Sequence, residues 1–104
     1  METEIVKIKE MIYELRGQKV MLDNDLASLY QVETKYLNRT VKRNIKRFPP
    51  DFMFQLSDKE WEDLRYQIGT AKNAGKTRYN PYVFTEQGIA MLSGLLNSDI
   101  AFNP

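Results

Sequence analysis

The sequence predicts an α+β domain, in which a small sheet of short strands packs against helices. Apolar runs of strand length occur at residues 11–15, 19–22, 52–55 and 82–84, and segments with the apolar spacing of helices lie between and after them. The chain has 104 residues, of which 42% are hydrophobic, so it can bury one core. We therefore expect a single domain over residues 1–104, with the order strand–strand–helix–helix–strand–helix–strand–helix.

The first two strands read as a hairpin. Gly17-Gln18 suits a tight turn with glycine at a positive φ, between strands at 11–15 and 19–22. Residues 3–10 fit either an extra strand or a frayed helix.

A pair of helices follows the hairpin. Asp23 is expected to cap a helix at 24–30, whose apolar stripe is Leu26, Leu29 and Tyr30. Thr34 is expected to cap a second helix that runs to Arg47, before the two prolines at 49–50. Residues 26–37 have helix-turn-helix spacing, and Val32 is expected to fill the core beneath the turn. The match is imperfect, because Gln31 occupies the turn position where glycine is favoured.

The second half of the chain predicts two more strand–helix units. Ser57 and Glu60 form a capping box ahead of a helix with Trp61, Leu64 and Ile68 on one face. A polar loop spans residues 69–80. The strand at 82–84 leads to Thr85, which is expected to cap a last helix that buries its apolar side. That side carries Ile89, Leu92 and Leu96.

Positive charge is concentrated in one window of the chain. Residues 34–47 contain six basic side chains and no acidic one, in a chain with 15 basic and 14 acidic residues, so the other 90 residues carry nine basic and 14 acidic residues, a net charge of −5. On a helical wheel Arg39, Lys42 and Lys46 fall within about 40° of Lys35, opposite Leu37, Val41, Ile45 and Phe48. Four like-charge pairs at i,i+4 would destabilise such a helix, which favours a polyanion as its partner. These pairs are Lys35–Arg39, Arg39–Arg43, Lys42–Lys46 and Arg43–Arg47.

The window predicts a double-stranded DNA surface, with Asn38 and Arg39, and then Lys35 or Tyr36, as candidates for base edges. A second basic element, Lys72, Lys76 and Arg78 in the loop, would act as a wing along the DNA. The candidate DNA-binding residues are Lys35, Tyr36, Asn38, Arg39, Lys42, Arg43, Lys46, Arg47, Lys72, Lys76 and Arg78. Three alternatives stay open: a solvated charged face, a basic face that docks an acidic protein regulator, and, for the loop, an ordinary polar surface segment. The aromatic residues at 79–84 read mainly as core, with base stacking as the alternative.

Composition excludes several function classes. The chain has no Cys and no His, no phosphate-binding glycine motif and no apolar run that would span a membrane. We therefore expect no metal, no cofactor and no enzymatic reaction, and a cytoplasmic protein without a signal peptide. A two-fold dimer would suit a helix-turn-helix, but no segment stands out as a dimer helix.

Four segments, in order, resemble one known family. They are IYELRGQKVML at 12–22, VKRNIKRFP at 41–49, DFMFQL at 51–56 and PYVFTEQGIAMLS at 81–93. They are similar to the ORF-six N-terminal domain, a relative of the KilA-N and Bro-N domains of phages and large DNA viruses. The resemblance implies DNA binding in a phage or prophage antirepressor-like or transcription-regulatory protein. It also implies a variable C-terminal region, so this chain is expected to be the N-terminal part of a longer protein.

Overall fold

The structure of the chain, a computed structural model, describes residues 8–68 and 79–102. The expected order of strands and helices is confirmed. The elements are β1 (Ile12–Leu15), β2 (Gln18–Leu22), α2 (Asp23–Tyr30), α3 (Thr34–Arg43), the 3-10 turn η1 (Ile45–Arg47), β3 (Met53–Gln55), α4 (Asp58–Ile68), β4 (Tyr82–Thr85) and α5 (Glu86–Phe102). Residues 8–10 are helical, so the described part of the N-terminal segment is not an extra strand.

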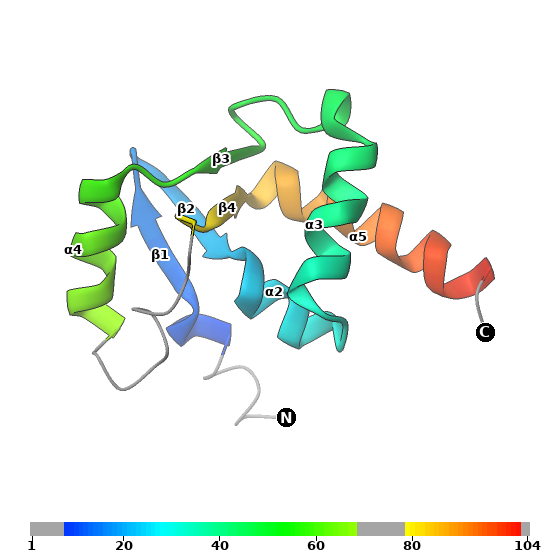
Figure 1. Cartoon of the computed structure of the whole chain (residues 1–104), viewed down its shortest axis with the longest axis horizontal. Helices are drawn as coiled ribbons and strands as arrows, with labels where there is room; N and C mark the ends of the chain where they lie inside the picture. The colour runs from blue at the N-terminus through cyan, green and yellow to red at the C-terminus, as the bar shows by residue number, and fades with distance from the viewer. Residues whose placement is uncertain (1–7, 69–78, 103–104) are drawn as a thin grey trace.

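A four-stranded antiparallel sheet, in the order β1-β2-β4-β3, lies at the centre of the fold (Figure 1). Met21, Phe84 and Met53 stand in one cross-strand row and point into a core shared with α2, α3 and α5. The next row along the same strands, Leu22–Val83–Phe54, belongs to a second core that α4 covers. Because side chains alternate along a strand, neighbouring rows fill opposite faces and give three layers.

The β1–β2 turn lies one residue earlier than expected. The two turn residues are Arg16 and Gly17, with φ values of 52° and 74°, and Gln18 already pairs with Leu15. Two successive positive φ values match the twist of a tight hairpin. The arginine at this unusual position forms a two-pronged ion pair with Glu60 at 2.9 and 3.0 Å and stacks on the Phe54 ring at 4.0 Å.

Helices α2 and α3 form the expected pair, joined by a tight turn (Figure 1). Gln31 adopts the left-handed conformation that glycine usually supplies there, and its N–H bonds to the Ser28 carbonyl. Val32 packs against the core beneath the turn, as expected. The predicted stripe of α2 was wrong at one position, because Ala27 is buried and Leu29 is exposed.

The predicted caps of these two helices were displaced by one residue. Asp23 and Thr34 are the first residues of α2 and α3, and the extended residues ahead of them are Leu22 and Glu33. The side chain of Asp23 bonds instead to the N–H of Asn24, at 2.7 Å. Strand β2 runs directly into α2, so no residue is left between them to act as a polar cap.

The predicted single helix over 34–47 was also wrong, because α3 ends at Arg43. Asn44 leaves the helical conformation, with φ at −123°, and its side-chain amide donates to the Thr40 carbonyl at 2.9 Å. That carbonyl would otherwise accept the backbone N–H of Asn44, so the side chain competes with helix continuation. The wheel fails beyond this break: Ile45, expected in the core, is 52% exposed. Phe48 is buried as expected and packs edge-on against Phe84 at 5.9 Å.

The capping box ahead of α4 is confirmed. The N–H of Glu60 donates to the Ser57 hydroxyl at 3.2 Å, and the N–H of Ser57 donates to the Glu60 carboxylate at 2.8 Å. Trp61 and Leu64 of this helix are buried in the second core.

Helix α5 starts at a crowded junction with the sheet. The Thr85 hydroxyl accepts the N–H of Gly88 at 3.4 Å, as expected of its cap. A Cβ at Gly88 would lie 1.9 Å from the Phe52 carbonyl oxygen, so only glycine fits there. Leu92 and Leu96 are fully buried and Ile89 is half-buried, which confirms the predicted apolar side.

Candidate nucleic-acid interface

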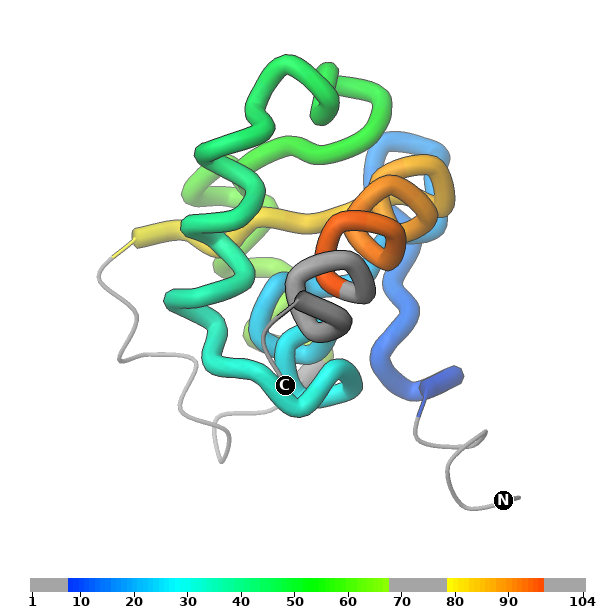
Figure 2. The backbone as a smooth tube through the Cα atoms, turned by 90° about the vertical axis from the view of Figure 1, so that its right-hand side faces the viewer, coloured from blue at the N-terminus to red at the C-terminus, as the bar shows by residue number. Residues whose placement is uncertain are grey.

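The six basic residues of 34–47 are exposed side chains of α3 and η1. The backbone of α3 and η1 runs along one side of the molecule, outside the sheet (Figure 2). All six basic side chains are exposed, and within the described ranges 8–68 and 79–102 none makes an ion pair with a carboxylate. We call this surface the basic ridge. It consists of Lys35, Arg39, Lys42, Arg43, Lys46 and Arg47.

The break at Asn44 halves the number of helical like-charge pairs. Lys35–Arg39 and Arg39–Arg43 lie within α3, one turn apart. The predicted pairs of Lys46 and Arg47 are not helical i,i+4 pairs, because η1 is a separate 3-10 turn. The cost in helix stability is therefore smaller than the sequence implied, although the charge density of the ridge remains.

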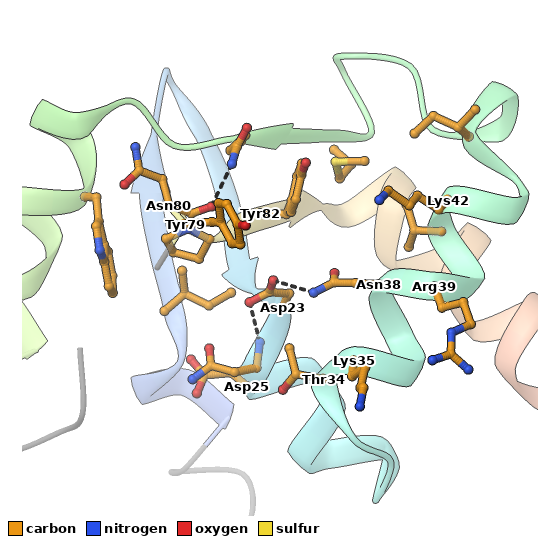
Figure 3. Close-up of a pocket in the computed structure, with 18 of the residues that line it drawn as sticks. Asp23, Asp25, Thr34, Lys35, Asn38, Arg39, Lys42, Tyr79, Asn80 and Tyr82 are labelled. Atoms are coloured by element: carbon orange, nitrogen blue, oxygen red, sulfur yellow. Dashed lines mark hydrogen bonds between the residues drawn. The ribbon is translucent and has the colours of Figure 1, made fainter. Parts of the chain in front are cut away.

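Asn38 lies beside the ridge and is held by a buried carboxylate. Its side-chain N–H donates to Asp23 at 3.1 Å, and both residues appear in Figure 3 with that bond drawn. Burial raises the pKa of Asp23 above its usual range, and the hydrogen bonds from Asn38 and from the backbone of Asn24 and Tyr82 oppose that rise. One of the two amide N–H groups of Asn38 is thus used inside the protein, and Asp23 connects α2, α3 and β4.

Tyr36 lies away from the ridge. It is half-buried and packs against the first core, which contains residues of α2 and α5. The structure thus brings together the six basic residues and places Asn38 at their border, while Tyr36 serves packing. Lys72, Lys76 and Arg78 lie outside the described residues.

A groove runs beside α3 and shares residues with the ridge. It has a volume of about 1130 Å³ and is lined by Lys35, Asn38, Arg39 and Lys42 on the α3 side. In Figure 3 Asn38 and Lys42 extend from α3 toward a second wall that carries the labelled residues 79, 80 and 82, whereas Lys35 and Arg39 lie at the edge of the groove and point away from that wall. The members of that wall are Tyr79, Asn80 and Tyr82, and Trp61 of α4 also lines the groove.

Comparison with known proteins identifies the family. The family model of the ORF6N domain matches residues 10–95, which is most of the chain. The chain belongs to the ORF6N domain family. This family is related to the KilA-N and Bro-N domains of phages and viruses, so the resemblance seen in the sequence is confirmed. Searches of curated proteins and of solved structures found no match to this ORF6N domain.

The groove of this ORF6N domain includes residues that sequence reasoning did not assign to a site. Trp61 and Asp23 gave no signal of a site, because Asp23 reads as a helix cap and Trp61 as part of the apolar face of its helix. Tyr79 and Tyr82 stood out only as part of an aromatic cluster, and of these Tyr79 is 75% exposed. Some 40 residues separate them from α3 in sequence, so only the folded chain brings them opposite the basic residues.

Two further properties concern the described part of this ORF6N domain. None of its helices there has the length and apolar character that a membrane-spanning helix requires. The same residues include no group of three or more Asp or Glu side chains placed to hold a metal ion.

Proposed function

We propose that this ORF6N domain binds double-stranded DNA through its basic ridge, as part of a phage antirepressor-like or transcription-regulatory protein, and that it catalyses no reaction. The observation that carries the proposal is the ridge itself: six exposed cations with no carboxylate partner among the described residues. Membership of the ORF6N family supports a phage-related regulatory role.

The geometry of α3 suits a duplex. Its second position in a helix pair and its exposed outer side match the helix that enters the major groove in helix-turn-helix proteins. Arg39 lies at the middle of the exposed row of α3, where its guanidinium would reach a guanine edge. Lys35, Arg43, Lys46 and Arg47 flank it and would contact phosphates.

Binding to a random duplex across a salt series tests this proposal. If four to six phosphates are contacted, log K should fall against log salt with a slope of about −3.5 to −5.5. Arg43→Gln should lower that slope by about one unit and weaken binding to all duplexes alike, because each phosphate contact releases counterions.

Lys59→Gln is the matched control. Lys59 is also exposed but lies on α4, which covers the opposite face of the sheet, so its loss should leave the salt slope unchanged. Both variants should unfold within about 0.5 kcal/mol of the wild type, as surface changes do. DNA binding by the ridge would be contradicted if Arg43→Gln and Lys59→Gln weakened duplex binding equally. It would also be contradicted if the domain bound an acidic protein tightly and bound no duplex at low salt. The second result would indicate a domain that docks an acidic regulator.

A further inference from the structure

The groove between α3 and the segment 79–82 has an aromatic wall that duplex binding by the ridge does not use. One wall is basic, because Lys35, Arg39 and Lys42 line it from α3. Ridge residues Arg43, Lys46 and Arg47 do not line it, so the groove and the outer part of the ridge are separate surfaces. The α3 wall offers a bound strand cations for its phosphates.

The opposite wall is aromatic and firmly held. Tyr79 is 75% exposed and Tyr82 is half-buried, and both line the groove (Figure 3). Asn80 between them is fixed at two points: its carbonyl accepts from Gln55 at 3.0 Å, and its side-chain N–H donates to Asp58 at 2.7 Å. Aromatic rings on an anchored segment are suited to stack on bases, because every base presents a flat π-face.

The size of the groove suits a short single strand. Its volume of about 1130 Å³ is close to that of a cleft for a small ligand, which is roughly 300–1,000 Å³. A short stretch of one strand would fit such a space, whereas a duplex, whose bases are already paired and stacked, has no free base faces for Tyr79 and Tyr82. The acidic side chains of Asp23 and Asp25 line the groove where α2 begins, so phosphates would follow the α3 wall instead.

We propose that this groove binds single-stranded DNA, with phosphates on Lys35, Arg39 and Lys42 and bases stacked on Tyr79 and Tyr82. The inference deepens the proposed function, because Lys35 and Arg39 would serve either ligand. Arg43, Lys46 and Arg47 would serve a duplex alone, and Tyr79 and Tyr82 an unpaired strand alone. The domain would then bind a duplex with a single-stranded tail more tightly than the fully paired duplex.

Trp61 makes the proposal directly testable. It is the only tryptophan of the chain and it lines the groove, so its fluorescence reports occupation of the groove and not of the outer ridge. Titration with oligo(dT) should change the Trp61 emission and give saturable binding by anisotropy. Tyr79→Ala should weaken oligo(dT) binding roughly 5- to 150-fold, from the value of one base–aromatic stack. Tyr79→Phe should retain it.

Tyr66→Ala is the control, because Tyr66 is also an exposed tyrosine, at 78%, but does not line the groove. It should leave oligo(dT) binding unchanged. Arg43→Gln separates the two surfaces: it should reduce duplex binding while the oligo(dT) response of Trp61 persists.

Three results would overturn the inference: oligo(dT) that leaves Trp61 emission unchanged, equal effects of Tyr79→Ala and Tyr66→Ala, or a tailed duplex bound no better than a paired one. A polyglutamate peptide that changes Trp61 emission as strongly as oligo(dT) would also overturn it, in favour of an acidic peptide in the groove. Duplex binding that depends on Arg43 would survive all four results, so the two proposals fail independently.

Discussion

At the scale of single residues, Gly88 shows how closely the backbone of α5 approaches the sheet. A Cβ at this position would come within 1.9 Å of the Phe52 carbonyl oxygen, which is itself fixed because it accepts the N–H of Thr85 at 3.0 Å. Gly88→Ala should therefore destabilise the fold by about 1–3 kcal/mol or more, since backbone atoms have to move. Urea denaturation followed by circular dichroism measures this loss.

Gly94 provides the matched control within the same helix. A Cβ there meets nothing within 4 Å. Gly94→Ala should stabilise the domain by about 0.5–1 kcal/mol, because alanine loses less backbone entropy than glycine in a helix. Similar effects of the two substitutions would show that α5 does not approach Phe52 as described.

At the scale of elements, the break after α3 separates two residues that the helical wheel places on one face. Leu37 in α3 is fully buried, whereas Ile45 in η1 is 52% exposed. Leu37→Ala should cost about 2–5 kcal/mol of unfolding free energy through a lost core contact and a cavity. Ile45→Ala should stay within about 0.5 kcal/mol of the wild type. Thermal melts that give comparable losses of unfolding free energy for Leu37→Ala and Ile45→Ala would mean that the helix continues to Arg47.

At the scale of the whole molecule, the Arg16–Glu60 ion pair joins the β1–β2 hairpin to α4. The Arg16 guanidinium is the main cause that lowers the pKa of Glu60 from 4.5 to about 2, and the N–H of Ser57 adds to it. A carboxylate with a lowered pKa in the folded state stabilises fully above its unfolded pKa. That contribution is lost as the pH falls from about 4.5 to about 2.

The stability difference between wild type and Glu60→Gln should therefore be largest at neutral pH and shrink as the pH falls through that range. Asp23 acts in the opposite sense, because burial raises its pKa and the folded state binds its proton more readily. The difference between the two proteins cancels this contribution, since both contain Asp23. Urea titrations at several pH values measure the difference, with Glu62→Gln, an exposed change on the same helix, as the control. If the stability difference between wild type and Glu60→Gln does not change with pH, the ion pair does not form in solution.

The candidate site was only partly predictable from the sequence. The basic window at 34–47 identified the six ridge residues, since clustered charge is a property of the linear chain. The predicted positions of Lys46 and Arg47 were wrong, because the Asn44 side chain ends the helix whereas a helical wheel assumes that the helix continues. The aromatic wall of the groove had no such linear signal, as it comes from a distant segment.

The sequence by itself determined the order of the elements, most of the two cores and the family, because periodicity, capping boxes and turn residues act over a few neighbouring positions. Only the tertiary structure decided the strand order β1-β2-β4-β3 and the three layers. It alone placed the segment 79–82 opposite α3 and Asp23 beneath Asn38. These arrangements depend on contacts between residues far apart in the chain. Such residues are buried against one another only in the folded state, so the pattern of neighbouring residues does not predict their contacts.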